Sequence, residues 1–132
     1  MSGGGEATAK RRVRTLIIDD DEDMRMLSTS IIRVANQGLE VVGQAEDGAT
    51  GLAMWRALHP DVVIIDYRMP DRTGLEVAAE MLAEEPGQPI ILFSAYLDTA
   101  VADAAEQTGV CSVLDKDRFN DLPHAVWACS GS

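Results

Sequence analysis

Five side chains that could do chemistry stand at the ends of short apolar runs. They are three carboxylates, a hydroxyl and an ammonium group: Asp19, Asp20, Asp66, Ser94 and Lys116. Mg²⁺ in proteins prefers one or two carboxylates together with waters and a phosphate oxygen. Lysine offers a compact positive charge to a phosphate, and a serine hydroxyl donates a hydrogen bond to it. Brought together by the fold, the five would form a site for Mg²⁺ and a phosphoryl group.

The apolar runs predict the strands that must position these side chains. The runs are short and rich in Val and Ile, which is typical of strands buried on both faces, and they cover residues 13–18, 39–42, 62–65, 90–93 and 110–114. Stretches with helical spacing lie between and after them, at residues 24–35, 49–58, 75–82, 99–108 and 120–129. This alternation predicts an α/β fold, a doubly wound five-stranded parallel sheet in the order 2-1-3-4-5 with helices on both faces. In that order the five polar side chains converge on one edge of the sheet.

The composition is that of one globular domain. The chain has 132 residues, of which 46% are hydrophobic and 25% charged. Its net charge of −11 repels nucleic-acid phosphates, so we expect no direct nucleic-acid binding. No apolar run has the length of a membrane span or signal peptide, and we expect a cytoplasmic protein. Residues 1–12 predict a flexible tail, 13–129 a single domain and 130–132 its C-terminal end.

The acidic run at residues 19–23 has two further interpretations. Its alternate acids match the first three ligands of an EF-hand calcium loop, but Met24 stands where that loop requires glycine and Ser30 where it requires glutamate. The last three acids are more simply explained as the start of a helix, whose N-terminal dipole favours negative charge. We therefore expect Asp19 and Asp20 to face a metal and the other three to begin a helix.

Four segments, in order, resemble the receiver domain of two-component response regulators. They are LIIDDDED at 16–23, PDVVIIDYRMPDRTGLEV at 60–77, ILFSAY at 91–96 and GVCSVLDK at 109–116, and the resemblance extends over residues 13–128. It implies a flavodoxin-like receiver fold. It also implies a protein that takes a phosphoryl group from a sensor histidine kinase or a phosphotransfer protein in a Mg²⁺-dependent reaction. The phosphorylated protein would then switch conformation to regulate an output domain or a partner.

The resemblance implies a role for each residue of the predicted site. Asp66 would be the phosphoacceptor, and Ser94 and Lys116 would contact the phosphoryl oxygens. Asp20 and Asp66 would coordinate Mg²⁺, while Asp19 would act mainly through water. The chain would then be a phosphoacceptor with self-catalysed transfer and autodephosphorylation, and not an enzyme. Two alternatives remain, an Asp-nucleophile phosphatase and a phosphorylation-independent docking module.

Three residues are expected to surround and modulate the acceptor. The backbone carbonyl of Arg68 would be a further metal ligand, by the same resemblance. Ala95 is small enough to admit a phosphodonor, whereas the large side chains of Arg68 and Tyr96 should hinder the water that hydrolyses the acyl phosphate.

Two positions depart from the family pattern. Val113 stands where receivers usually carry Tyr or Phe, and Asp117 where Pro is frequent. Valine has one stiff rotatable bond and no ring, so it cannot make the inward turn by which the aromatic reports phosphorylation. We expect Ser94 to engage the phosphoryl group while the surface of the helix at 99–108 either changes little or changes by another route, such as through Tyr96. The family also includes phosphorylation-linked homodimers, and Asp117 resembles receivers attached to helix-turn-helix output domains, which favours a transcription regulator.

The two cysteines, Cys111 and Cys129, are too few for a disulfide framework and lack metal-ligand spacing. We expect both to fill small apolar gaps in the core.

Overall fold

The computed structural model describes residues 12–35 and 38–131, so the predicted N-terminal tail lies almost entirely outside the described residues. Five parallel strands form one sheet in the order β2-β1-β3-β4-β5, which confirms the predicted fold class. The strands are β1 (Val13–Ile18), β2 (Leu39–Ala45), β3 (Val62–Ile65), β4 (Ile90–Ser94) and β5 (Ser112–Asp115). The helices are α2 (Glu22–Ala35), α3 (Gly48–Leu58), α4 (Gly74–Glu84), α5 (Thr99–Thr108) and α6 (Leu122–Cys129), with a 3₁₀ helix η1 (Lys116–Asp121) before α6.

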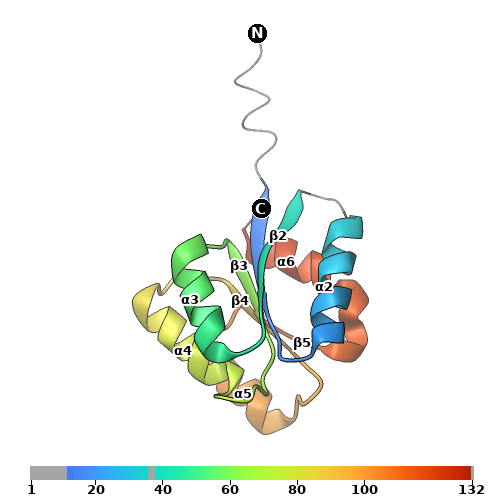
Figure 1. Cartoon of the computed structure of the whole chain (residues 1–132). Helices are drawn as coiled ribbons and strands as arrows, with labels where there is room; N and C mark the ends of the chain where they lie inside the picture. The colour runs from blue at the N-terminus through green and yellow to red at the C-terminus, as the bar shows by residue number, and fades with distance from the viewer. Residues whose placement is uncertain (1–11, 36–37, 132) are drawn as a thin grey trace.

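The helices cover both faces of the sheet, with α3, α4 and α5 on one side and α2 and α6 on the other (Figure 1). Each face has its own buried apolar cluster. Because successive strand residues point to opposite faces, Leu16 and Ile18 of β1 enter the first cluster and Ile17 enters the second. The strands are thus buried on both sides, as their near-continuous apolar sequences require.

Short polar side chains set where the helices begin. Asp21, Asp47, Thr73 and Asp98 accept hydrogen bonds from backbone N–H groups in the first turns of α2, α3, α4 and α5. Gly109 ends α5 in the left-handed conformation, with φ of 101°. The acids after β1 therefore do begin a helix, as expected.

The last strand and helix differ from the predicted boundaries. The backbone N–H of Val110 still bonds to the carbonyl of Ala105 at 3.3 Å, so this residue completes the end of α5 and β5 begins at Ser112. Residues 116–121 form η1, whose start is capped by Asp115, and the α-helix begins at Leu122 with a proline in its first turn.

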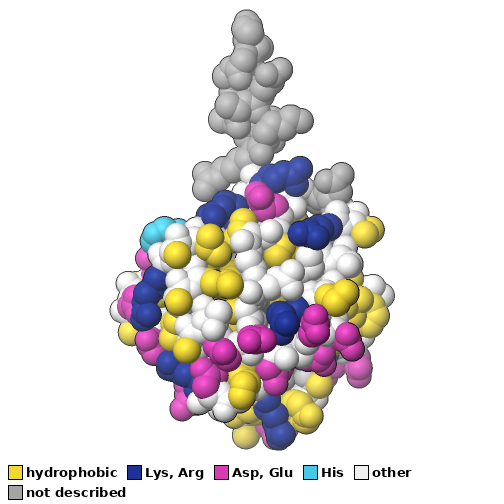
Figure 2. Space-filling view, in the orientation of Figure 1, with side chains coloured by type: hydrophobic (Ala, Val, Ile, Leu, Met, Phe, Trp, Pro, Cys, Tyr) yellow, Lys and Arg dark blue, Asp and Glu magenta, His cyan; other side chains and the backbone are white. Residues whose placement is uncertain are grey.

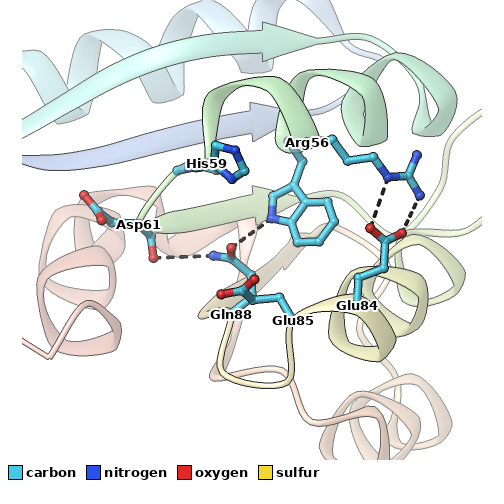
Figure 3. Close-up of a pocket in the computed structure, with 8 residues that line it drawn as sticks. Arg56, His59, Asp61, Glu84, Glu85 and Gln88 are labelled. Carbon is cyan, nitrogen blue, oxygen red and sulfur yellow. Dashed lines mark hydrogen bonds and ion pairs between the residues drawn. The ribbon is translucent and has the colours of Figure 1, made fainter.

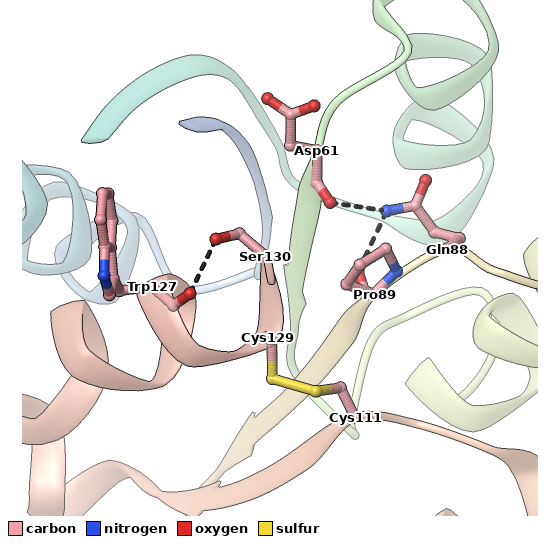
Figure 4. Close-up of a disulfide and its surroundings, with 7 residues drawn as sticks. All are labelled: Asp61, Gln88, Pro89, Cys111, Trp127, Cys129 and Ser130. Carbon is pink, nitrogen blue, oxygen red and sulfur yellow. Dashed lines mark hydrogen bonds between the residues drawn. A yellow bond between two sulfur atoms is a disulfide. The ribbon is translucent and has the colours of Figure 1, made fainter. Parts of the chain in front are cut away.

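The expectation that the cysteines fill apolar gaps is wrong. Cys111 and Cys129 form a disulfide, with 6.0 Å between their Cα atoms (Figure 4). A helix that follows a strand in this fold runs back along it, so the last turn of α6 returns to the place where β5 starts. The sequence separation of 18 residues is closed by that return.

Polar packing joins α3 to the loop before β4, at the amino ends of the strands (Figure 3). The indole of Trp55 donates to the Gln88 side chain at 2.8 Å, and Gln88 donates to the carbonyl of Pro89 at 3.0 Å. Arg56 forms an ion pair with Glu84 of α4. A hollow of about 370 Å³ lies there, at the opposite end of the sheet from the predicted site.

Gly74 is the residue whose absence of a side chain the fold uses most directly. A Cβ atom at this position would lie 2.0 Å from the backbone carbonyl oxygen of Asp66, so Gly74→Ala must push α4 away from the end of β3. We expect this substitution to reduce the free energy of unfolding by at least about 2 kcal/mol and the melting temperature by about 6 °C or more. Gly87→Ala is the matched control, since its Cβ would meet no atom within 4 Å. Equal melting temperatures for the two variants would contradict the close approach.

Candidate functional site

The sheet brings the five predicted polar side chains to its carboxyl edge. Asp19 and Asp20 follow β1, Asp66 follows β3, Ser94 is the last residue of β4, and Lys116 follows β5. These four strands are neighbours in the sheet. Asp19, Asp66 and Ser94 are buried, whereas Asp20 is exposed.

Lys116 connects the acids of two strands. Its Nζ lies 2.8 Å from Oδ2 of Asp19 and 3.1 Å from Oδ2 of Asp66. The exposed fraction of the side chain is 13% for Lys116, and lower for both acids. An ammonium placed between two buried carboxylates offsets part of the free energy that their desolvation costs.

Backbone groups hold the two buried acids in place. Oδ1 of Asp19 accepts from the N–H of Asp21 at 2.9 Å, and the Asp19 carbonyl accepts from Arg25 at 2.6 Å. Oδ1 of Asp66 accepts from the N–H of Tyr67 at 2.7 Å, and the N–H of Asp66 donates to the carbonyl of Ile18 at 3.0 Å. Each carboxylate therefore has one oxygen on the backbone and one on Lys116.

The electrostatics of the pair follow from burial and charge. Burial raises the pKa of Asp66, and the nearby Asp19 adds to that rise, while Lys116 and the Ser94 hydroxyl oppose it. Burial alone would lower the pKa of Lys116, but its hydrogen bond to Asp19 and the charge of Asp66 outweigh burial and raise the pKa. Lys116 is therefore a fixed positive charge at neutral pH.

Three carboxylates form a cluster with the chemistry of a hard-cation site. Asp19, Asp20 and Asp66 each offer an oxygen, and these oxygens lie within 4.8 Å of one another. Oxygens on opposite sides of a Mg²⁺ ion are separated by about 4.2 Å, because each bond is about 2.1 Å long. The single ammonium of Lys116 leaves the cluster with excess negative charge. The donor set and its spacing thus fit a divalent cation.

A hollow of about 800 Å³ opens beside the cluster and is lined by Asp66, Lys116, Arg68, Ala95 and Tyr96, among others. The guanidinium of Arg68 lies 4.0 Å from the ring centre of Tyr96, so the two large side chains stack at the rim. Acidic side chains lie at several places over the lower half of the view in Figure 2, among basic and apolar ones, at the end where the strands of Figure 1 finish.

Ser94 and Val113 lie on the neighbouring strands β4 and β5. The Ser94 hydroxyl accepts from the N–H of Tyr96 at 3.1 Å, which leaves its proton to donate. Val113 is half-buried and packs against the cluster on the α3–α4–α5 face.

Sequence reasoning missed Asp71, which anchors the loop after Asp66. Its two carboxylate oxygens accept from the N–H groups of Gly48 and Ala49, each at 2.9 Å, at the start of α3. These bonds lower the pKa of Asp71. The partners are more than 20 residues away, so no local spacing could have indicated the contact.

Comparison with known proteins identifies a family. The model of the response regulator receiver domain matches residues 15–126. The chain is 38% identical over 112 residues to the regulatory protein AtoC of Escherichia coli K12, which covers 81% of this chain and 23% of that protein. It is 35% identical over 120 residues to the probable transcriptional regulatory protein NarL of Mycobacterium tuberculosis, which covers 90% of this chain and 55% of that protein.

Solved structures agree with the fold. The signal receiver domain of NarL from Mycobacterium tuberculosis superposes with a TM-score of 0.86 at 32% identity, covering 92% of this chain and 98% of that one. The response regulator domain of Thermotoga maritima CheB superposes with a TM-score of 0.84 at 24% identity, covering 92% and 98%, and supports the fold alone. The chain spans from about a quarter to just over half the length of the two curated relatives above. Among the described residues, no helix is long and apolar enough to cross a membrane.

The excess charge of the cluster generates a prediction for Asp20. In metal-free protein, Asp20→Asn removes repulsion with Asp19 and Asp66, so the melting temperature in chelator should rise by about 3 °C. The same substitution should weaken Mg²⁺ binding by about tenfold, measured by calorimetry. Asp103→Asn makes the same charge change on α5 and controls for relief of overall negative charge. A melting temperature for Asp20→Asn below that of the unsubstituted chain would contradict the repulsion argument.

Proposed function

Because the chain belongs to the response regulator receiver domain family, we propose that Asp66 accepts a phosphoryl group from a sensor histidine kinase or a phosphotransfer protein. The phosphorylated domain then regulates an output domain or a partner. The observation that carries this proposal is the pairing of Lys116 with Asp19 and Asp66 beside an open hollow at the carboxyl edge of the sheet. In this role the chain is a phosphoacceptor and not an enzyme.

The chemistry assigned to Asp66 is nucleophilic attack by its carboxylate. A carboxylate oxygen forms a bond to phosphorus as the N–P bond of a phosphohistidine breaks, and the electron pair of that bond stays on the departing imidazole. Both reactants are anionic, and at an effective dielectric of about 20 two unit charges about 4 Å apart interact by about 4 kcal/mol. Lys116 offsets this repulsion by contacting a phosphoryl oxygen, and the Ser94 hydroxyl donates a hydrogen bond to another.

The acidic cluster is the proposed metal site. Asp20 and Asp66 would hold Mg²⁺ with the backbone carbonyl of Arg68, and Asp19 would act mainly through water. The ion supplies positive charge next to the phosphoryl oxygens. The support for this assignment is the spacing of the carboxylate oxygens and their excess of negative charge over Lys116.

The wider setting is also a proposal. AtoC and NarL are regulatory proteins by name and extend well beyond the part matched here. We infer that this receiver serves a transcription regulator in the cytoplasm, and that a phosphorylation-linked homodimer is one form of its output. The acidic receiver itself makes no direct contact with nucleic acid. With valine at position 113, either the α5 surface changes little or the readout reaches it by a route other than the turn of an aromatic ring, such as through Tyr96.

Phosphorylation at Asp66 is tested by intact-mass analysis after incubation with acetyl phosphate and Mg²⁺. We expect one phosphate per chain in the unsubstituted protein and in the Asp103→Asn control, and none in Asp66→Asn, because the nucleophile is gone. An undiminished phosphate peak in Asp66→Asn would reject the assignment. Continuous release of phosphate without accumulation of a labelled chain would favour the Asp-nucleophile phosphatase, and absence of both labelling and release in the unsubstituted chain would favour the docking module.

The stacked pair at the rim predicts the lifetime of the phosphorylated form. Arg68 and Tyr96 stack on each other and line the hollow that opens onto Asp66, so replacing both with Ala should admit the hydrolytic water more often. We expect dephosphorylation to become faster by about threefold, equivalent to less than about 1 kcal/mol of barrier. Arg118→Ala removes an arginine outside this hollow and should leave the rate unchanged. A slower or unchanged decay in the double variant would reject steric shielding.

A further inference from the structure

The disulfide joins two elements that meet at the end of the sheet remote from Asp66. Cys111 precedes β5, and Cys129 is the last residue of α6 (Figure 4). Lys116 lies at the opposite end of β5. The sulfur chemistry and the phosphoryl site are therefore separated by the length of one strand.

Few side chains at the end of α6 pack against the interior of the domain. The fully buried side chains of this helix are Leu122 and Val126, and the second of them begins the last turn. Of the residues that follow, Trp127 is 37% exposed and Ala128 is exposed as well. Beyond Val126, among the described residues of the helix, Cys129 is the one that packs against the buried cluster. After Val126, it is Cys129 that attaches the helix to the buried cluster.

On the other side of the bond, the backbone is fixed to the interior of the sheet. The N–H of Cys111 donates to the carbonyl of Ile90 at 2.7 Å, at the start of the fully buried strand β4. β5 itself is an edge strand that pairs with β4 alone, and its residues are all half-buried. The disulfide therefore links the end of α6 to a residue whose backbone is bonded to the buried strand β4.

The pair is open to small molecules. Cys111 is exposed, and both cysteines line a surface groove of about 500 Å³ between β5 and α6. In the reducing cytoplasm, where the proposed function places this chain, disulfides are rare and are usually transient or redox-sensing. A solvent-accessible pair is in contact with that thiol pool.

We propose that Cys111 and Cys129 form a thiol–disulfide switch that fastens the end of α6 to the sheet when the surroundings become oxidising. The thiolate of Cys111 attacks the S–S bond of an oxidised low-molecular-weight thiol, one thiolate leaves, and a mixed disulfide forms. The thiolate of Cys129 then attacks the sulfur of Cys111 and expels the second thiolate. The two leaving groups take up the two protons lost by the cysteines, so that one small disulfide is reduced as one protein disulfide forms.

The full chain tests this in glutathione buffers of increasing oxidised fraction. Mass analysis after alkylation should show two free thiols in reduced glutathione and none in oxidised glutathione, with the protein monomeric in both. Reduction should lower the melting temperature by about 10 °C, because an 18-residue loop is no longer closed in the unfolded chain. It should also speed amide exchange at the end of α6 while leaving α3 unchanged. Equal melting temperatures and equal exchange in the two forms would overturn the proposal, as would a disulfide that forms between chains.

Three variants serve as controls. The double variant Cys111→Ser, Cys129→Ser should have a melting temperature close to that of the reduced chain. That temperature should not change with the redox state of the glutathione buffer. Cys129→Ser, which keeps the exposed cysteine, should form its glutathione adduct on the order of tenfold faster than Cys111→Ser. The reverse order would overturn the assignment of Cys111 as the attacking thiol. Labelling by acetyl phosphate in the same samples reports on Asp66. Absence of labelling would count against the proposed function, whereas the redox measurements would still test the switch.

Discussion

The contact between Lys116 and the acids of β1 and β3 is the interaction on which the candidate site depends. Asp19 and Asp66 are both buried. Two neighbouring carboxylates in a protein interior have a large free-energy cost of desolvation, and they also repel each other. One ammonium within 3.1 Å of both removes part of each penalty. It does so incompletely, since Asp20 adds a third negative charge. That residual negative charge suits this edge of the sheet to a divalent cation.

This contact constrains the rest of the chain, because its three partners come from three strands. The order β1-β3-β4-β5 lets Lys116 reach Asp19 and Asp66 at once. The loop after Asp66 is also fixed by contacts with the rest of the domain. Gly74 lies against the carbonyl of Asp66, and Asp71 is bonded to the start of α3. Asp66 is thus positioned by the neighbouring strands and by the α3 and α4 segments that cover one face of the sheet.

The sequence predicted those features that are local or periodic. Strand order and helix positions followed from short Val- and Ile-rich runs, from helical spacing and from the rules for parallel sheets, and the convergence of polar residues followed from the order. The roles of Asp66, Ser94 and the metal ligands remain predictions. The disulfide was missed because its partners meet only when α6 runs back along β5. The contact of Asp71 with Gly48 was missed because nothing near either residue indicates the other.

The strand β5 lies between the candidate phosphoryl site and the disulfide. Its four residues run in register with β4, from the pair of Ser112 with Ile91 to the pair of Asp115 with Ser94. One end leads into Lys116, which responds to charge at Asp66, and the other follows Cys111, which responds to oxidants. Between these two ends, Val113 packs against the buried cluster on the α3–α4–α5 face. Its side chain has no aromatic ring that could turn inward. The four residues of this edge strand therefore connect Lys116 at one end to Cys111 at the other, and β4 is the strand with which they pair.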